Sequence, residues 1–199
     1  MNEKIREEKR RLRSQVKQLE QGLEEAYLAA CGAAVNTQLL ALPEYRAART
    51  VFCFASFGRE LPTWAFLQEV LKSGRRLCLP RCAKGGELEL CVVRALGELA
   101  PGAYGILEPR KDAPRLLPED VDLAVVPCCA CTASGERLGR GGGYYDRFLA
   151  QYRGAAVMLT MERLLLDALP TEPHDAVIPL VLTERGLYRR GKMTSLAEG

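Results

Sequence analysis

The sequence predicts an α/β fold in which helices cover both faces of a largely parallel central sheet. Two observations predict it. Strand-like and helix-like segments alternate from about residue 50 onward, and the segment 123–126 is apolar throughout, as in a strand buried on both faces. Strands separated by helices favour parallel pairing, because a helical crossover returns the chain to the same end of the sheet. At 199 residues the chain is most simply one domain, which we expect to span residues 1–199.

The N-terminal segment, from residue 3 to about residue 40, is rich in Glu, Lys, Arg, Leu and Ala and predicts a helix. Gly22 and Gly32 weaken this helix locally, since glycine has a low helix propensity. Pro43 marks its end, because proline disfavours the helical conformation of the residue before it.

Strands and two further helices follow. Thr63 is suited to cap a helix between the first two strands, which Gly74 ends. A second helix begins at Tyr144. The predicted strands are 50–57, 76–80, 88–93, 123–126, 155–160 and 177–182. We expect the tail from about 188 to 199 to fray.

Short loop segments follow most of these strands. In a parallel sheet the carboxyl ends of the strands lie at one edge, where ligands bind. We therefore expect several loop segments to meet there: 58–60, 80–81, the residues after Pro127, those after Thr160, and 183–184.

With 48% hydrophobic and 27% charged residues, the composition is that of a soluble globular protein. The net charge of +3 is too small to indicate a nucleic-acid partner by itself. No run approaches the roughly 18 apolar residues of a membrane-spanning helix. The N-terminus lacks the apolar core of a signal peptide, and Glu3, Glu7 and Glu8 argue against an organelle transit peptide. We expect a cytoplasmic protein with no membrane partner.

The chain has eight cysteines: Cys31, Cys53, Cys78, Cys82, Cys91, Cys128, Cys129 and Cys131. Most have apolar neighbours, which is typical of small buried side chains in a reducing compartment. The alternative is a zinc site formed by Cys78, Cys82 and the cysteines at 128–131. Its spacing resembles no standard zinc pattern, and His174 is the only histidine. We therefore expect neither zinc nor a structural disulfide.

The most informative segment is 135–146, Gly-Glu-Arg-Leu-Gly-Arg-Gly-Gly-Gly-Tyr-Tyr-Asp. Four of its glycines lie within 139–143, beside Arg137 and Arg140. Glycine reaches positive φ easily, so successive N–H groups can turn toward one anion, and the helix from Tyr144 would add its N-terminal dipole. The pattern favours a phosphate site. It matches neither Gly-x-x-x-x-Gly-Lys-Ser/Thr nor Gly-x-Gly-x-x-Gly, so a surface turn with solvated arginines is the alternative.

Further short motifs occur in order along the chain. They are Lys-Arg-Arg-Leu-Arg at 9–13, Phe-Ala-Ser-Phe-Gly-Arg-Glu-Leu-Pro-Thr at 54–63, Leu-Pro at 79–80, Gly-Ile-Leu-Glu-Pro at 105–109, the glycine loop at 135–146, His-Asp at 174–175 and Thr-Glu at 183–184. In this set and order they resemble the 5-formyltetrahydrofolate cyclo-ligase family, also called methenyltetrahydrofolate synthetases, over nearly the whole chain.

The resemblance implies an enzyme that closes 5-formyltetrahydrofolate to 5,10-methenyltetrahydrofolate, with ATP as co-substrate and Mg²⁺ as cofactor, and releases ADP and phosphate. The formyl oxygen is thought to take the γ-phosphoryl group, after which N10 attacks the activated carbon. The implied fold is a three-layer α/β sandwich similar to ribose-phosphate isomerases and CoA transferases. The implied partners are the folate and ATP, with no nucleic acid, and we expect a monomer.

The resemblance also implies roles for individual residues. The implied ATP-binding residues are Lys9, Arg10, Arg11, Leu12, Arg13, Arg137, Leu138, Gly139, Arg140, Gly141, Gly142, Gly143, Tyr144 and Tyr145. The implied folate-binding residues are Ala55, Glu60, Tyr104, Arg140, Gly141, Gly142, Gly143 and Tyr144. Asp146 and Asp175 match the metal positions. These residue types suit phosphoryl transfer, which needs positioning and neutralisation of charge, and Mg²⁺, which binds few carboxylates plus phosphate oxygens.

One segment departs from the family pattern. After the proline of one signature the family usually continues Gly-x-x-Phe-Asp, whereas this chain continues Cys-Cys-Ala-Cys-Thr at 128–132. The departure supports one alternative, a paralogue that binds folate or nucleotide without closing the ring. The other alternative is an RNA-binding module that uses basic residues of the N-terminal helix, such as Lys4, Arg6 and Lys17. Interleaved glutamates and the lack of an aromatic platform weigh against it.

Overall fold

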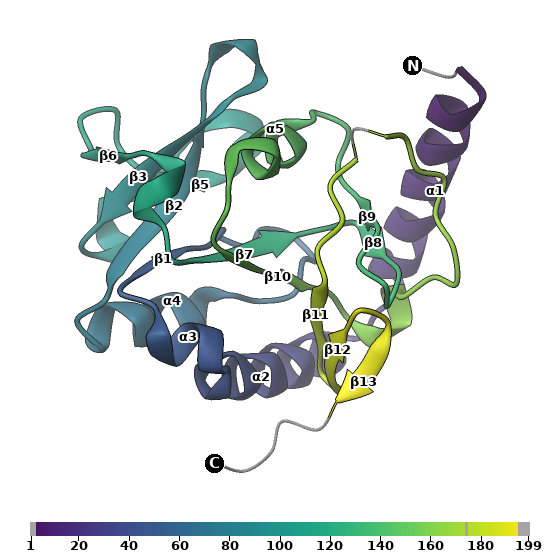
Figure 1. The fold of residues 1–199 in the computed structure, drawn as a ribbon, viewed down its shortest axis with the longest axis horizontal. Coiled ribbons are helices and arrows are strands. Elements are labelled where there is room, and N and C mark those ends of the chain that lie inside the picture. Colours follow the sequence, from purple (N-terminus) through teal and green to yellow (C-terminus); the bar gives the residue numbers. More distant parts are fainter. Residues whose placement is uncertain (1–2, 174, 195–199) are drawn as a thin grey trace.

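The computed structural model describes residues 3–173 and 175–194 (Figure 1). Its α-helices are α1 (Glu3–Gln21), α2 (Glu25–Ala41), α3 (Pro43–Ala47), α4 (Trp64–Lys72) and α5 (Tyr144–Gln151). The main sheet contains β1 (Thr50–Phe52), β2 (Arg76–Cys82), β3 (Leu88–Val93), β6 (Arg115–Leu116), β7 (Leu123–Pro127), β10 (Ala155–Leu159), β11 (Leu180–Thr183), β12 (Gly186–Arg189) and β13 (Lys192–Thr194). Two small sheets pair β4 (Ala100–Pro101) with β5 (Leu107–Glu108) and β8 (Ala130–Cys131) with β9 (Arg137–Leu138). Across these ranges, no helix has both the length and the apolar composition needed to span a bilayer.

The main sheet is mixed. Over the described residues it has nine strands in the order β13-β12-β11-β10-β7-β1-β2-β3-β6. The strands from β11 to β2 pair in parallel, as expected, but the outer strands on both sides pair antiparallel. Short connections explain three of these pairings, β2–β3, β11–β12 and β12–β13, because they can join only antiparallel neighbours. β6 instead follows the longer segment 94–114, which carries the β4–β5 hairpin. The turn between β2 and β3 contains Gly85 and Gly86 at positive φ. The turn between β12 and β13 likewise contains two residues at positive φ, Arg190 and Gly191.

The single helix expected over residues 3–40 is wrong, because the chain forms two helices there. α1 ends at Gln21, next to Gly22, and Leu23 is buried before α2 begins. The break lets α1 lie at the side of the molecule beside β8 and β9 while α2 packs under the sheet (Figure 1). Gly32 does not break α2. An added Cβ there would lie 3.1 Å from Pro62, so this glycine permits close packing.

The fraying expected from about residue 188 is wrong for the described part of the tail. Residues 186–194 form β12 and β13 and extend the sheet beyond β11. Leu187 is buried, and the Tyr188 hydroxyl donates a hydrogen bond to Glu162 at 2.7 Å. These contacts anchor the tail to the sheet. Residues 195–199 and His174 lie outside the described residues.

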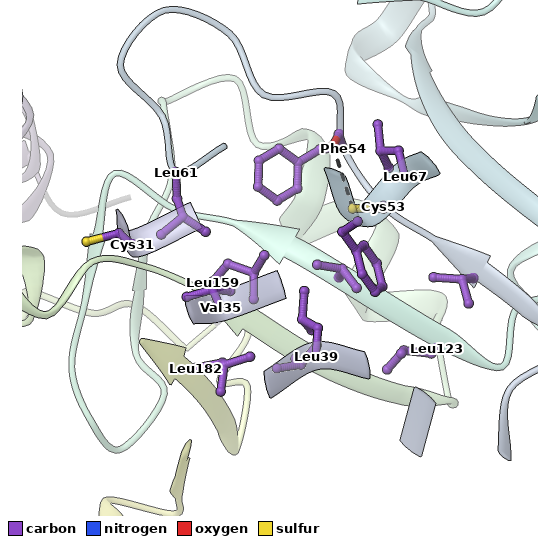
Figure 2. Packing of buried hydrophobic residues seen from close by; sticks show 14 of the residues in the cluster. Cys31, Val35, Leu39, Cys53, Phe54, Leu61, Leu67, Leu123, Leu159 and Leu182 are labelled. Atoms are coloured by element: carbon purple, nitrogen blue, oxygen red, sulfur yellow. Dashed lines mark hydrogen bonds between the residues drawn. The ribbon is translucent and has the colours of Figure 1, made fainter. Parts of the chain in front are cut away.

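Alternating side chains of the central strands divide the core into two clusters, one on each face of the sheet. In β1, Val51 belongs to the larger cluster and Phe52 to the smaller one. Helices α2 and α4 cover the larger cluster, and Figure 2 shows Val35 and Leu39 of α2 pointing into it. Helix α5 covers the smaller cluster through Phe148, whose ring centre lies 4.8 Å from that of Phe52. Helices therefore lie on both faces, as predicted (Figure 1).

Thr63 fastens the loop that follows β1. It stands at the N-cap position of α4, but its side chain makes no capping hydrogen bond, so the predicted capping role is wrong. Its hydroxyl instead donates to Phe54 O at 2.8 Å and accepts from Ser56 N at 3.1 Å. The Thr63 N–H donates to Ser56 Oγ at 3.0 Å. These bonds fix the loop that carries Glu60 at the carboxyl end of β1.

Candidate active site

A pocket of about 390 Å³ lies at the carboxyl ends of β1, β2 and β7. Pockets of this size hold small-molecule ligands. Its wall comes from the loops after these strands, the β4–β5 hairpin and the first turn of α5. A smaller cavity, bordered by Glu60, Cys128 and Thr160, shares part of this wall.

The expectation that loop segments meet at this edge is largely confirmed. Glu60, Pro80 and Pro127 line the main pocket, and Thr160 lines the smaller cavity. The segment 183–184 borders neither of them, since Glu184 accepts hydrogen bonds from Tyr27 and from the backbone N–H of Glu162.

Glu60 and Arg140 form an ion pair on one wall. Arg140 Nε and Nη2 donate to Glu60 Oε1 at 2.9 and 2.7 Å. Glu60 Oε2 accepts from Phe57 N at 3.1 Å, and the Arg140 guanidinium lies 4.9 Å from the centre of the Phe57 ring. Burial raises the pKa of Glu60, and the attraction of Arg140 offsets this only in part. Burial is the largest single effect on Arg140 and would lower its pKa, but the charges of Glu60, Cys129 and Glu20 and the hydrogen bond to Glu60 together raise it.

A second ion pair joins the glycine loop to α5. Arg137 Nη2 donates to Asp146 Oδ1 at 2.6 Å, and Nη1 donates to Pro127 O at 3.3 Å. Arg137 is buried, and within the described part of the chain its Nε has no hydrogen-bond partner. Leaving a buried donor of a charged group unsatisfied is costly. Arg137 also lines the pocket, so its positive charge lies beside any anion bound there.

The glycine loop has the conformation that its sequence predicts. Gly141 and Gly143 have φ of 98° and 67°, a region that glycine adopts without the strain of a Cβ. Gly143 directly precedes α5, and no side chain caps this helix. Arg147 of α5 holds the loop in place, because its Nη2 donates to Gly142 O at 2.7 Å and its Nε donates to Gly86 O at 2.8 Å. The positive N-terminal end of α5 thus lies at the pocket.

The opposite wall carries Tyr104, on the turn between β4 and β5. Tyr104 is 76% exposed and has a φ of 58°, which a side chain rarely adopts. Interaction with Tyr104 raises the pKa of the Tyr144 phenol. Deeper in the wall, the buried Glu108 accepts from Cys82 N at 3.2 Å. The first contact connects the hairpin to the glycine loop, and the second connects it to β2.

Helix α1 reaches the other side of the glycine loop. Arg13 Nε donates to Gly139 O at 2.7 Å. Lys9 Nζ lies 2.5 Å from Asp175 Oδ2 and 3.6 Å from Glu172 Oε2. The Lys9, Asp175 and Glu172 side chains are 11%, 11% and 7% exposed, so this cluster is nearly buried.

The predicted site residues fall into two groups. Those that line the pocket are Ala55, Glu60, Tyr104, Arg137, Gly139, Arg140, Gly142, Gly143, Tyr144, Tyr145 and Asp146. Those that do not are Lys9, Arg10, Arg11, Leu12, Arg13, Leu138, Gly141 and Asp175. Lys9 and Asp175 nevertheless contact each other, and Arg13 contacts the loop. In the part of the chain that the structure describes, no cluster of three or more His, Cys, Asp and Glu suited to a metal ion is present.

The cysteines are all free thiols. The expected burial is confirmed for Cys31, Cys53, Cys78, Cys91, Cys129 and Cys131. Cys82 and Cys128 differ, since they are partly exposed and line the pocket.

Sequence reasoning missed several pocket residues, among them Phe57, Cys82 and Glu108. Phe57 and Glu108 belong to motifs noted above, so their position in those motifs was a usable signal. Arg147 was also missed, and no local pattern distinguishes it from a solvated helix arginine.

Comparisons with known proteins identify the family. The model of the 5-formyltetrahydrofolate cyclo-ligase family matches residues 5–184. The 5-formyltetrahydrofolate cyclo-ligase of Escherichia coli (strain K12) is 32% identical over 158 residues, which cover 76% of this chain and 87% of that protein. The enzyme of the same name from Mycolicibacterium smegmatis is 35% identical over 151 residues, covering 70% of this chain and 76% of that protein.

Solved structures agree. The NMR structure of Aquifex aeolicus 5,10-methenyltetrahydrofolate synthetase superposes with a TM-score of 0.83 at 32% identity, covering 94% of this chain and 95% of that chain. A Mycoplasma pneumoniae synthetase at 19% identity, with a TM-score of 0.72 over 88% of this chain and 98% of that chain, shows the shared fold. The chain is an α/β protein with a large mixed sheet and a pocket at the carboxyl ends of its parallel strands. It belongs to the 5-formyltetrahydrofolate cyclo-ligase family.

Proposed function

We propose that this chain catalyses the ATP-dependent closure of 5-formyltetrahydrofolate to 5,10-methenyltetrahydrofolate, with release of ADP and phosphate. One observation carries the proposal: the family motifs at 54–63, 105–109 and 135–146 are distant in sequence but converge on the wall of one pocket. Family membership gives the reaction class, and this convergence supports the retention of that reaction here.

The reaction requires an activated formyl group. The formyl oxygen takes the γ-phosphoryl group of ATP, and ADP leaves. N10 of the folate then attacks the formyl carbon and loses its proton, and the carbon–oxygen bond breaks as phosphate departs. Phosphoryl transfer depends mainly on positioning and charge stabilisation, so the pocket must hold the formyl oxygen in line with the γ-phosphorus.

We assign the folate to the wall that carries Ala55, Glu60 and Tyr104. The Glu60 carboxylate is held by Arg140 and by Phe57 N, and it can accept N–H donors of a pterin ring. Tyr104 is exposed beside the pocket and offers its ring for contact with a flat ligand. Because Glu60 has a raised pKa, its acceptor role requires a pH above that pKa.

We assign the ATP phosphates to the glycine loop. Arg137 and Arg140 supply fixed positive charge, and the positive φ values at Gly141 and Gly143 are those of loops that turn N–H groups toward an anion. The N-terminus of α5 adds its dipole. Lys9 and Arg13 extend this side from α1, and Arg13 is already anchored on Gly139.

The residues present fit a bound Mg²⁺ through Asp146. The ion takes one or two carboxylates together with phosphate oxygens and water, so a large cluster of acids is not required. Asp146 lines the pocket and is 25% exposed, with one oxygen held by Arg137. Asp175 is the second proposed ligand, and its Oδ2 is held by Lys9. When bound, the ion would neutralise phosphate charge, while Arg137 holds the Asp146 carboxylate in place.

A turnover assay tests the proposal. Purified protein is mixed with 5-formyltetrahydrofolate, ATP and Mg²⁺, and the near-ultraviolet absorbance of the methenyl product is followed together with ADP. We expect product and ADP in equal amounts, and none without ATP. Glu60→Gln should reduce turnover strongly, whereas Glu119→Gln, an exposed change outside the pocket, should not.

Other outcomes identify the alternatives. ATP or folate affinity without product would indicate a non-catalytic paralogue. RNA affinity that is lost on replacing the exposed Arg6 and Lys17, with no folate binding, would indicate an RNA-binding module.

We further propose that the enzyme is a one-domain monomer that works in the cytoplasm. The free cysteines support the location, because disulfides persist in oxidising compartments and thiols in reducing ones.

A further inference from the structure

Two cysteines at the pocket have the spacing Cys-x-x-Cys. Cys128 follows β7 and lines the pocket, whereas Cys131 lies in β8 and is fully buried. Both belong to the segment 128–132, where the chain departs from the family pattern. The proposed reaction uses neither thiol, so their place at the pocket requires another explanation.

The two thiols lie close together. Cys131 is a buried member of the smaller core cluster, and Cys128 packs against the same cluster. Each sulfur interacts most strongly with the other, and Thr160 interacts with both. Backbone pairing holds the short segment between them, because Cys129 N donates to Leu138 O at 2.7 Å and Cys131 pairs with Arg137 between β8 and β9. The pair therefore has a fixed arrangement at the pocket wall.

Their surroundings shift the pKa values of the two thiols in opposite directions. The hydrogen bond from Cys131 lowers the pKa of Cys128, Thr160 and the Arg137 charge act in the same direction, and together they outweigh burial. The same contact, together with burial, raises the pKa of Cys131. Cys128, which also lines the pocket, is therefore the nucleophilic sulfur, and the fully buried Cys131 is the resolving thiol that holds its proton until a later step.

We propose that Cys128 and Cys131 are a redox-active dithiol: Cys128 is the acceptor site for a low-molecular-weight disulfide such as oxidised glutathione, and Cys131 then closes a Cys128–Cys131 disulfide. The proposal does not depend on the proposed function, because the disulfide can be detected without turnover.

The exchange has two steps. The Cys128 thiolate attacks one sulfur of the small disulfide, whose S–S bond breaks. A mixed disulfide forms on Cys128, and the first small thiolate leaves. Cys131 then gives up its proton and attacks the Cys128 sulfur, releasing the second small thiolate. The protein loses two electrons and two protons, and the small disulfide becomes two thiols.

Closure of the disulfide changes the pocket wall. The two sulfurs move to bonding distance of about 2.05 Å, which removes the Cys128 thiol and the hydrogen bond that it donates to Leu159 O at 3.5 Å. Arg137 borders the same pocket. We expect the disulfide form to bind ATP more weakly than the dithiol form.

The test is a redox titration with peptide mapping. The reduced full-length protein is equilibrated with defined ratios of oxidised to reduced glutathione, quenched in acid and treated with N-ethylmaleimide. Trypsin leaves Cys128, Cys129 and Cys131 on one peptide, 116–137, and fragmentation locates each modification. We expect a peptide that lacks two hydrogens and carries one maleimide, on Cys129.

Three variants assign the roles. Cys131→Ala should trap glutathione on Cys128, because the resolving thiol is gone, and Cys128→Ala should abolish both products. Cys129→Ala is the matched control and should still form the disulfide. Its thiol is the less reactive neighbour, because burial raises the pKa of Cys129 to about 11. Because the pKa of Cys128 is lowered and that of Cys129 is raised, we expect Cys128 to be alkylated faster than Cys129 near neutral pH.

Two results would overturn the proposal. One is a wild-type peptide that keeps three maleimides at every glutathione ratio. The other is glutathione that appears on Cys129 as readily as on Cys128 in Cys131→Ala. If Cys131→Ala does not fold, the wild-type peptide map and the alkylation rates decide alone. Formation of the disulfide without any cyclo-ligase turnover would contradict the proposed function and leave the dithiol standing.

Discussion

Replacing Lys9 by methionine tests whether this residue stabilises the fold, binds ATP or does both. Lys9 is a proposed ATP contact, and it also faces Asp175 at 2.5 Å and Glu172 at 3.6 Å in a nearly buried cluster. Methionine keeps the length and the apolar stem of lysine but removes the ammonium group. The two carboxylates would then lose the positive charge between them.

The magnitude follows from the burial of the cluster. Removing one partner of a buried ion pair lowers the free energy of unfolding by about 3–5 kcal/mol. Because these side chains keep some exposure to solvent, we expect about 3 kcal/mol for Lys9→Met. For a chain of this size each kcal/mol shifts Tm by roughly 2–4 °C, so we expect Lys9→Met to lower Tm by roughly 6–12 °C. α1 buries only Lys9 and Val16, so its amide protons should also exchange faster.

The assay combines thermal unfolding with ATP titration by calorimetry. Arg10→Met is the matched control, because Arg10 is the next residue on α1, is 78% exposed at its side chain and should change stability by less than about 0.5 kcal/mol. A double-mutant cycle with Asp175→Asn should show coupling well above about 0.5 kcal/mol. An unchanged Tm with weakened ATP binding, or additive effects in the cycle, would refute the structural role of the Lys9–Asp175 pair.

Three further predictions concern the glycine loop and the pocket. Gly141→Val forces a β-branched residue to a φ of 98°, a strain of roughly 1–2 kcal/mol, so ATP affinity should fall more than folate affinity. The control Gly97→Val, at a position with open space around it, should change neither affinity. Normal ATP binding by Gly141→Val would show that the loop is an ordinary turn. Asp146→Asn should lower turnover by about 10²–10³ and raise the Mg²⁺ concentration required, whereas unchanged Mg²⁺ dependence would limit Asp146 to its pairing with Arg137. The native state binds a proton on Glu60 more tightly than the unfolded chain does, so the free energy of unfolding should decrease as pH rises from 4.5 through the raised pKa of Glu60. Urea unfolding at several pH values should show this decrease in the wild type. An equal decrease in Glu60→Gln would contradict the assignment to Glu60.

The elements that sequence reasoning placed well are those with a strong local pattern. The predicted strand 88–93 agrees with β3, and the helix from Tyr144 agrees with α5. The glycine loop was also found, because positive φ at Gly141 and Gly143 is a property that glycine itself carries. The family followed from ordered motifs, and the comparisons confirm it. The likeness to ribose-phosphate isomerases and CoA transferases stays a prediction.

The sequence by itself therefore determined the type of most elements, the family and the segments that build the pocket, since periodicity, glycine content and short motifs are local properties. Only the tertiary structure decided which charges meet. Glu60 and Arg140 are 80 residues apart, and Lys9 and Asp175 are 166 apart. No local pattern records such a pairing, because it depends on where the sheet brings its loops and on how α1 docks against them. The antiparallel outer strands and the contact between Cys128 and Cys131 have the same origin: packing chooses among pairings that the local sequence leaves open.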